Sequence, residues 1–220
     1  MTQDFSTKHY APRAYEKMQD VLMDPTAPGS EIQYHMVRGG SEQRNITVWE
    51  PGRVGNEYIK TYGHYHVGDL DETYWIIFGE GIAILQKRAI DANGNPIDDE
   101  IEQAFAVHVK PDDSIFIPSE WGHLVVNISK TYFATADDSP VNFDEANPVS
   151  MPGHADYEAV KKMQGFCYYV VEENDQPKLI KNPKYKIVPD IQIIEASEYP
   201  LKKEWPLDNL SNYSHNIINA

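Results

Sequence analysis

Three histidines and one glutamate are spaced so that they could form a metal site. His64 and His66 are separated by one residue, Glu72 follows across the turn-forming pair Gly68-Asp69, and His123 comes much later in the chain. Side chains two positions apart on a strand point the same way, so both imidazoles of the His-x-His pair can approach one point. Three imidazoles and one carboxylate suit Fe²⁺, Mn²⁺, Ni²⁺ or Zn²⁺ and leave open positions on an octahedral ion. The pattern therefore predicts a catalytic metal centre.

The surrounding residues make this pattern more specific than any of its parts. A lone His-x-His is common on solvated strand faces, and a lone glutamate is more often an ordinary surface carboxylate. Here the histidine pair is followed by Glu72, by Gly79, and later by a Pro-x₃-Gly-His-x₃-Asn segment that runs from Pro118 to Asn127. Because Glu72 opens the expected strand 73–78, we expect an antiparallel partner to bring it opposite the histidine pair.

Short β-like segments dominate the chain from about residue 31 to about residue 137. Gly79-Glu80-Gly81 predicts a tight hairpin, and residues 91–96 predict another turn. Strands separated by turn signals every 8 to 12 residues or so indicate a sandwich or barrel rather than alternating βαβ units. The expected strands are 46–48, 58–66, 73–78, 82–85, 104–109, 114–117, 124–128 and 132–135.

The two ends of the chain are expected to pack on this β domain. Tyr15, Met18 and Leu22 lie at helical spacing before the helix breaker Pro25, which predicts a short N-terminal helix. A late hairpin is expected over residues 166–181, around Asn174-Asp175. We expect a single domain with three parts: an N-terminal helix and loop (1–30), the β-barrel itself (31–185) and a C-terminal extension on the same domain (186–220).

These motifs resemble the two cupin motifs and, within the cupins, the archaeal-type phosphoglucose isomerases. The resemblance runs from about residue 47 to about residue 185 and is carried by the segments Thr47–Gly55, Thr61–His66, Glu72–Tyr74, Pro118–His123 and Gly153–Tyr157. The spacing from His66 to Glu72 is one residue shorter than in the family, and one residue is inserted between His154 and Tyr157. The resemblance implies an all-β cupin (jelly-roll) β-barrel and interconversion of glucose 6-phosphate and fructose 6-phosphate.

The resemblance also implies the roles of individual residues. It gives one divalent ion per chain, Fe²⁺ as first choice with Mn²⁺, Ni²⁺ and Zn²⁺ as alternatives, held by His64, His66, Glu72 and His123. It gives proton-transfer roles to Glu72, Tyr74 and His154, and phosphate binding to Thr47, Thr61, Gly63 and Tyr157. Glu72 is the favoured base, although binding to a metal weakens a carboxylate base, so a neighbouring group stays an alternative. The insertion leaves open which of His154 and Tyr157 reaches the site.

A bend at Gly63 is needed if both groups of residues are to share one site. Strict alternation along a strand would place Thr61 and His64 on opposite faces of the sheet. We therefore expect a bulge or bend at Gly63. The absence of a side chain there would also let an anion approach the backbone N–H.

Composition restricts the partners. The formal net charge of −15 argues against nucleic acid or a membrane surface as partner. A phosphorylated substrate would then need local positive potential from a metal ion or from backbone N–H groups. Cys167 is the single cysteine, which excludes an intrachain disulfide and favours a cytoplasmic location. The expected partner is a small sugar phosphate, and the family resemblance implies a homodimer.

Two other functions remain alternatives at this point. Three histidines and a glutamate also bind metal in cupin dioxygenases and decarboxylases, and a fold does not determine a function. A non-enzymatic sugar-binding cupin is the second alternative, but such proteins commonly lack one ligand, and all four are present here. The set Thr47, Thr61 and Gly63, together with the segment 153–157, favours the isomerase.

Overall fold

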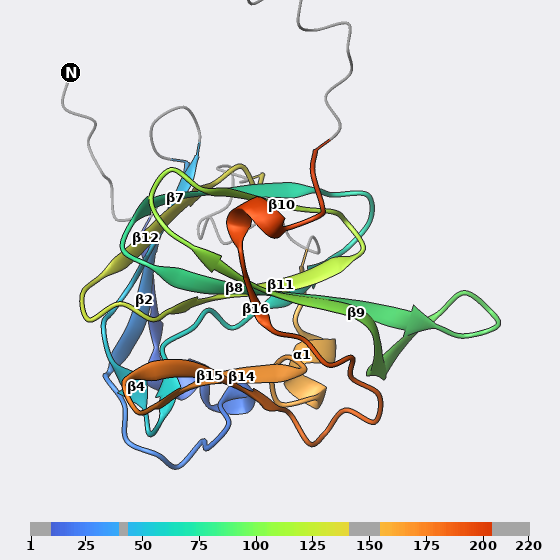
Figure 1. Ribbon diagram of the computed structural model, residues 1–220, viewed down its shortest axis with the longest axis horizontal. Coiled ribbons are helices and arrows are strands. Elements are labelled where there is room, and N and C mark those ends of the chain that lie inside the picture. The colour runs from blue at the N-terminus through green and yellow to red at the C-terminus, as the bar shows by residue number, and fades with distance from the viewer. Residues whose placement is uncertain (1–9, 40–43, 141–154, 204–220) are drawn as a thin grey trace, which may run out of the picture.

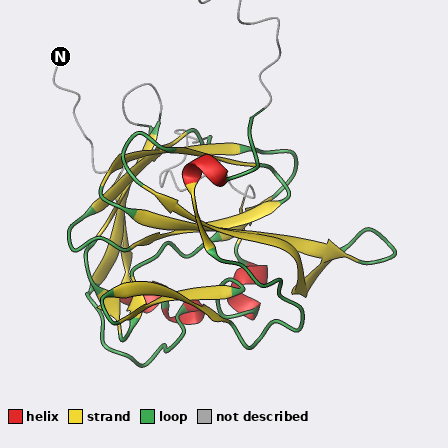
Figure 2. Ribbon diagram, in the orientation of Figure 1, coloured by secondary structure: helices red, strands yellow, loops and turns green. Residues whose placement is uncertain are grey.

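Two six-stranded sheets, the first and the second sheet, form the body of the protein. The computed structural model describes residues 10–39, 44–140 and 155–203, and strands dominate it (Figures 1 and 2). The first sheet has the order β1 (Tyr10–Ala14), β2 (Ile32–Val37), β3 (Asn45–Trp49), β12 (Phe133–Asp137), β7 (Glu72–Phe78), β10 (Ser114–Ile117). The second has the order β13 (Ala155–Asp156), β6 (His64–His66), β11 (Trp121–Asn127), β8 (Gly81–Ile90), β9 (Pro96–Val109), β16 (Ile193–Glu195).

A smaller sheet and a few helical turns complete the described structure. The four-stranded sheet has the order β15 (Gln176–Lys181), β14 (Tyr168–Glu173), β5 (Glu57–Tyr58), β4 (Arg53–Val54). The helical segments are the 3₁₀ helices η2 (Tyr15–Lys17), η3 (Gln19–Val21) and η5 (Ala196–Glu198), and the α-helix α1 (Glu158–Lys162). In Figure 1 the small sheet and α1 lie together below the two large sheets. The predicted hairpin around Asn174-Asp175 is confirmed, since β14 pairs with β15 on either side of these residues, both at positive φ.

Eight of the strands follow jelly-roll order. The neighbours β3, β12, β7 and β10 lie in the first sheet, and β6, β11, β8 and β9 lie in the second. If these eight strands are renumbered 1 to 8 in chain order, the first sheet has the order 1-8-3-6 and the second has the order 2-7-4-5. This is the arrangement of two Greek keys in a jelly roll. The predicted all-β jelly-roll fold is confirmed. Within the described residues no strand of one sheet pairs with a strand of the other, so the structure is a two-sheet sandwich without barrel closure.

The hydrophobic core lies between the two sheets and continues behind the second one. Trp49 and Phe133 of the first sheet are almost fully buried, with ring centroids 5.0 Å apart. All residues of β11 and the first six of β8 are buried. Strands that bury successive residues must be covered on both faces, because side chains alternate between faces. The second sheet is therefore the central layer.

The prediction of an N-terminal α-helix is wrong, but the residues that it expected to face the core do pack against it. Residues 10–14 form strand β1, and two short 3₁₀ helices follow in place of an α-helix. Met18 and Leu22 are nevertheless buried, and Tyr15 packs against the core while its hydroxyl donates to the carbonyl of Ala27 at 2.7 Å. The spacing of apolar residues correctly identified side chains that face the core. The first residues of the expected helix instead pair with β2 as strand β1, so tertiary pairing overrides their helical tendency.

Gly79-Glu80-Gly81 is not the predicted hairpin. It connects β7 of the first sheet to β8 of the second, and these two strands do not pair. Gly79 has a φ of +77°, and a Cβ there would lie 2.6 Å from the carbonyl oxygen of Tyr132. The prediction of a turn at these glycines is confirmed, but the turn connects two different sheets and not two paired strands. The turn at 91–95, by contrast, does join paired strands, and the long β8–β9 hairpin projects from the body (Figure 1).

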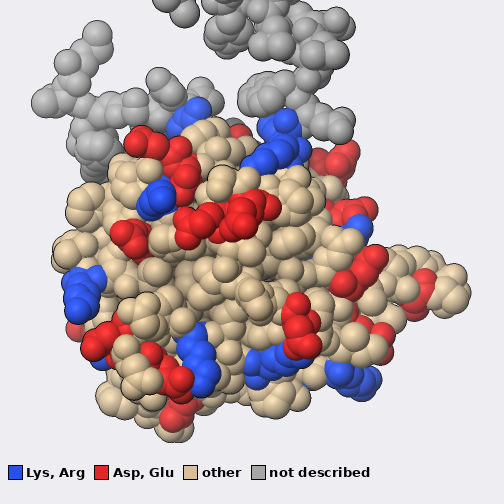
Figure 3. Space-filling model, in the orientation of Figure 1, with Lys and Arg blue, Asp and Glu red and all other residues tan. Residues whose placement is uncertain are grey.

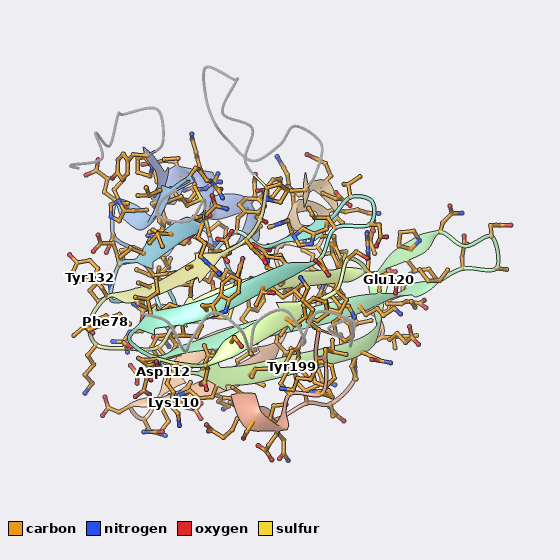
Figure 4. The ribbon with its side chains drawn as sticks, turned by 90° about the horizontal axis from the view of Figure 1, so that it is seen from above. Phe78, Lys110, Asp112, Glu120, Tyr132 and Tyr199 are labelled. Carbon is orange, nitrogen blue, oxygen red and sulfur yellow. The ribbon has the colours of Figure 1, made fainter. Side chains whose placement is uncertain are left out.

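The last described residues of the chain contact both large sheets. Strand β16 adds to β9 in parallel, and Tyr199 is buried with its hydroxyl donating to the carbonyl of Phe116 at 2.8 Å. Figure 4 shows the labelled exposed rings of Phe78 and Tyr132 at one end of the sandwich, remote from Glu120. Acidic and basic side chains are interspersed over the face in Figure 3. Among the described residues, none of the helices has the length and apolarity needed to cross a membrane.

Candidate metal centre

The four predicted ligand residues converge inside the sandwich. One candidate ligand atom from each of His64, His66, Glu72 and His123 lies within 4.8 Å of all the others. Oε2 of Glu72 lies 3.2 Å from Nε2 of His66 and 3.1 Å from Nε2 of His123. Bonds of about 2.1 Å to one octahedral ion would place neighbouring ligand atoms about 3 Å apart. Donor type and spacing both fit a divalent metal ion.

Strand pairing places the three histidines. β6 carries His64 and His66 on one face, and His123 of the neighbouring strand β11 is the register partner of His64. The ring centroids of His64 and His123 are 4.5 Å apart, and those of His66 and His123 are 5.0 Å apart. The prediction that His-x-His presents both imidazoles to one point is confirmed.

Glu72 reaches the histidines from the opposite sheet, which corrects the prediction of an antiparallel partner strand. It opens β7 in the first sheet, where its register partner is Ile117 of β10. Its carboxylate therefore projects from the first sheet, across the interior of the sandwich, toward the imidazoles of the second sheet. The site joins the two layers, so its geometry depends on how the sheets pack against each other.

Tyr65 fixes the strand between the two histidines from its other face. Because side chains alternate, the ring of Tyr65 points away from the ligands, and its hydroxyl accepts a hydrogen bond from Nε2 of Gln86. The guanidinium of Arg88 lies 4.0 Å from the centre of the ring. Gly122 makes room for this ring, since a Cβ there would come within 2.6 Å of it. This buried network holds β6 in register with β11.

One cavity is lined by three members of the cluster, His64, Glu72 and His123, and by most of the other predicted site residues. Its lining includes Tyr74 and all four predicted phosphate-binding residues, Thr47, Thr61, Gly63 and Tyr157. The ring of Tyr157 lies 5.3 Å from that of His64, and the ring of Tyr74 lies 5.3 Å from that of His123. The sequence left open whether His154 or Tyr157 reaches the site. Tyr157 lines the cavity, and His154 lies outside the described residues.

Gly63 provides the expected bend, and its missing side chain also makes room for neighbouring core residues. Its φ of +79° takes the chain out of strand geometry, so Thr61 and His64 can line the same cavity. A Cβ at this position would meet Phe166 at 2.8 Å and Leu124 at 3.1 Å. The missing side chain thus leaves room for core packing.

Three ionisable groups at the site, Glu72 of the cluster and its neighbours Tyr74 and Asp137, have shifted pKa values. Burial alone would raise the pKa of Glu72, but the charge of His123 and hydrogen bonds from His123 and His66 hold that pKa well below its usual value. Burial, together with the negative charge of Glu72, raises the pKa of Asp137 and of Tyr74 well above the usual range. Glu72 is thus favoured as a carboxylate, while Tyr74 keeps its proton and can donate it in a hydrogen bond.

Seven residues that line the cavity were missed in the sequence, and four of them carry the arguments that follow. Arg13, Tyr34, Arg38 and Asp137 all line the cavity. The alternation of side chains along a strand could have identified two of these four residues. Asp137 lies an even number of positions after buried Phe133 in β12, so both side chains are on the same face, and Arg38 lies two positions after buried Met36 of β2. Nothing in the local sequence marked Arg13, since its position depends on pairing of β1 with β2.

Fold and site together define a jelly-roll protein with an internal cluster of three histidines and one glutamate that can hold a divalent metal ion. Residues 14–188 match the family model described as glucose-6-phosphate isomerase (GPI). The chain belongs to this family.

Curated relatives carry the same description. The glucose-6-phosphate isomerases of Thermococcus onnurineus and Pyrococcus furiosus are 33% and 32% identical over 141 residues, which is 64% of this chain and 62% of each relative. That of Thermococcus gammatolerans is 28% identical over 175 residues, 79% of both chains. The resemblance to the archaeal-type family is thereby confirmed, although the chain spans less than two thirds of the first two relatives.

Solved structures give a weaker likeness. An oxalate oxidase structure is 16% identical with a TM-score of 0.32, over 48% of this chain and 43% of the other. The cupin domain of Drosophila melanogaster CENP-C is 13% identical with a TM-score of 0.33, over 50% of this chain and 71% of the other. TM-scores at this level support no inference about function.

Proposed function

We propose that this protein is a metal-dependent glucose-6-phosphate isomerase that interconverts glucose 6-phosphate and fructose 6-phosphate. One observation carries the proposal. Three of the candidate ligands, His64, Glu72 and His123, line the same cavity as the candidate phosphate donors Thr47, Thr61, Gly63 and Tyr157. Family membership supports the same reaction.

In this proposal His64, His66, Glu72 and His123 hold one divalent ion per chain. When bound, the ion supplies Lewis acidity that makes the hydrogen on the carbon next to the substrate carbonyl easier to remove. The difficult step in aldose–ketose isomerisation is this transfer of hydrogen between C1 and C2. His66, Glu72 and His123 are buried, and this low exposure to bulk water strengthens electrostatic interactions among them.

Glu72 is proposed to move the proton between the two carbons. Its depressed pKa keeps the carboxylate ionised, and it is held on the cavity side of the first sheet by the pairing of β7. Tyr74, two residues further along the same strand face, is proposed to donate a hydrogen bond to a substrate oxygen, because its raised pKa preserves the phenol proton. His154 remains a candidate for the same work. Deuterium at C2 that is lost to solvent during turnover would support proton transfer, and complete retention would support a hydride shift.

Thr61 is proposed to contribute to phosphate binding through its hydroxyl. Oγ1 accepts the N–H of Val125 at 3.0 Å, so the hydroxyl proton can point to a ligand. Thr47 lies on β3, opposite Met36 of β2, on the inner face of the first sheet. The ring of Tyr157 lies in the same cavity, with its centroid 5.3 Å from that of His64.

Several finer properties belong to the same proposal. Fe²⁺ is the proposed ion, a homodimer the proposed assembly and the cytoplasm the proposed location, the last supported by the single buried Cys167. Residues 1–30 and 186–220 are proposed to be parts of one domain with 31–185. Elemental analysis of purified protein and its mass in solution by light scattering would test the ion and the assembly.

The experiment that tests the function is metal removal and replacement. Chelator-treated protein would be reloaded separately with Fe²⁺, Mn²⁺, Ni²⁺ and Zn²⁺ and assayed for conversion of fructose 6-phosphate, coupled to a dehydrogenase specific for glucose 6-phosphate. We expect no activity in the stripped protein and recovery with at least one ion. Activity in none of the metal forms would contradict the proposal.

A further inference from the structure

The cavity contains positive charge in a chain that is strongly acidic overall. The formal net charge is −15, which repels an approaching phosphate at long range. Two arginines, Arg13 and Arg38, nevertheless line the cavity that holds the candidate metal site. Two other arginines form ion pairs, Arg53 with Glu172 and Arg88 with Asp98. Within the described ranges, no carboxylate oxygen lies within 4.0 Å of the guanidinium of Arg13 or Arg38.

Arg13 is tied directly to the segment that carries the predicted phosphate donors. It lies on edge strand β1 opposite Tyr34, and its Nε donates a hydrogen bond to the Tyr34 hydroxyl at 3.1 Å. The same hydroxyl accepts the backbone N–H of Tyr62 at 3.3 Å. Tyr62 lies between Thr61 and Gly63, so Tyr34 connects the guanidinium to the backbone between these two residues.

The aromatic neighbours place Arg13 on the same side of the cavity as Tyr157. Arg13 is close enough to Tyr157 and Tyr62 to interact with them electrostatically, and the rings of Tyr62 and Tyr157 pack edge to face with centroids 5.5 Å apart. Among the described residues its one side-chain hydrogen bond runs from Nε. The terminal N–H groups of the guanidinium thus remain for a ligand, and their planar fork matches two oxygens of a phosphate.

Arg38 lies toward a different part of the same cavity. Its electrostatic partners are Tyr74 and Asp137, which lie beside Glu72 in the metal cluster. Nη2 of Arg38 contacts the sulfur of Met36 at 3.1 Å, and its buried Nε has no hydrogen-bond partner in the described structure. The two guanidiniums therefore have different neighbours: Arg13 is bonded to the segment of the predicted phosphate donors through Tyr34, and Arg38 interacts with Tyr74 and Asp137.

We propose that Arg13 binds the phosphate group of the substrate and makes the cavity selective for phosphorylated sugars. The identity of the ligand as a sugar phosphate rests on the proposed function, whereas binding of a phosphate by Arg13 does not. The residues that match the family model begin at residue 14, so the match does not include Arg13. The residue supplies locally the charge that the chain as a whole lacks.

The test uses the metal-loaded enzyme and four variants. Arg13→Met removes the charge, Arg13→Lys keeps the charge without the planar fork, and Arg38→Met removes the other arginine charge of the cavity. Arg53→Met is the matched control outside the cavity. For each, the Kd of inorganic phosphate would be measured by calorimetry, and KM and kcat would be measured with fructose 6-phosphate. Metal content and melting temperature would be recorded alongside.

We expect Arg13→Met to weaken phosphate binding and to raise KM by about 10- to 100-fold, the range for loss of charged hydrogen bonds, with kcat nearly unchanged. Arg13→Lys should show a smaller loss because a point charge remains. Arg53→Met should bind phosphate as the unaltered enzyme does. If Arg13→Met reduces stability, Arg13→Lys carries the test, and phosphate binding equal to the unaltered enzyme in that folded variant would overturn the proposal.

Other results separate this proposal from the function proposed above. Unchanged phosphate affinity in folded, metal-containing Arg13→Met would overturn the role of Arg13, as would a loss confined to Arg38→Met. An unaltered protein that binds phosphate through Arg13 but converts no fructose 6-phosphate would support the role of Arg13 and contradict the isomerase.

Discussion

Among the residues that the structure describes, two glutamates are almost completely buried, and their surroundings differ in chemistry. Glu57 is 1% exposed and Glu72 is 2% exposed. Glu57 accepts hydrogen bonds from the Nζ of Lys60 and, at 2.8 Å, from the backbone N–H of Met23. Lys60 in turn donates to the carbonyl of Val21 at 2.7 Å. Every charge in this pair has a counter-charge or a hydrogen bond.

Glu72 faces imidazoles in a cavity. No lysine or arginine in the described residues forms an ion pair with it, and its carboxylate oxygen instead lies about 3 Å from two histidine nitrogens (3.2 and 3.1 Å). Burying a carboxylate costs free energy unless charge and hydrogen bonds compensate it. The comparison teaches that burial of a charge does not identify a functional site, whereas the type of partner and access to a cavity do. Glu57 has a structural role, and Glu72 is proposed to have a catalytic one.

The largest effect that would sharpen this comparison is expected for Glu72→Gln. The amide has nearly the same shape but neither negative charge nor basicity, so isomerase activity should fall by about 10³-fold or more. Circular dichroism should show the fold retained, and elemental analysis should show reduced metal content. Activity within tenfold of the unaltered enzyme would remove Glu72 from both of its proposed roles.

Lys60→Met should affect stability instead of catalysis. It leaves Glu57 buried without its counter-charge, which should lower the free energy of unfolding by about 3–5 kcal/mol, measured by urea denaturation. The kcat of the folded protein should stay close to that of the unaltered enzyme. Lys87→Met, which breaks the exposed pair with Glu120, is the control and should cost less than about 1 kcal/mol. A large loss of kcat in Lys60→Met would mean that the two buried glutamates do not differ as described.

Thr61→Val tests the phosphate end of the cavity. Loss of the hydroxyl should raise KM for fructose 6-phosphate by about tenfold, with metal content intact. The N–H of Val125 also loses its acceptor, so a stability loss of about 1 kcal/mol should accompany the change. Unchanged KM would exclude Thr61 from phosphate binding.

Asp137 offers a third buried carboxyl, with a smaller and pH-dependent effect. Burial and the charge of Glu72 raise its pKa in the folded protein above the unfolded value. As pH rises past the ordinary value of about 4, the unfolded chain loses this proton first, so the folded state loses stability until the folded pKa is passed. Metal-free Asp137→Asn should therefore match the unaltered protein near pH 4 and melt at a higher temperature at pH 8. The opposite trend would mean that the carboxyl is stabilised as an anion.

Local sequence patterns predicted most strands, the turns and all four members of the metal cluster. His64 and His66 could be paired because strand periodicity acts over two residues, and Gly63 could be recognised as a bend because alternation demanded one. Long-range pairing could not be predicted in this way. Whether Glu72 reaches the histidines from a neighbouring strand or from the opposite sheet depends on where β7 pairs, and a glycine-rich corner at residue 79 looks like a hairpin until that pairing is known.

The same limitation explains the arginine that was missed. Arg13 belongs to the cavity because β1 adds to the edge of the first sheet opposite Tyr34. No motif surrounds it, and the apolar residues that follow at helical spacing favoured a helix in this part of the chain. Edge-strand addition is a tertiary event whose free energy comes from the partner strand, so its outcome is not contained in the local sequence.

The central claim is that one divalent ion binds between the two sheets at the three histidines and Glu72. Anomalous diffraction at the absorption edge of the metal, from crystals of the metal-loaded protein, tests it most directly. The account predicts one peak per chain, at about 2.0–2.3 Å from a side-chain atom of each of the four residues. A catalytically active crystal with its metal peak elsewhere, or with no peak at this cluster, would contradict it.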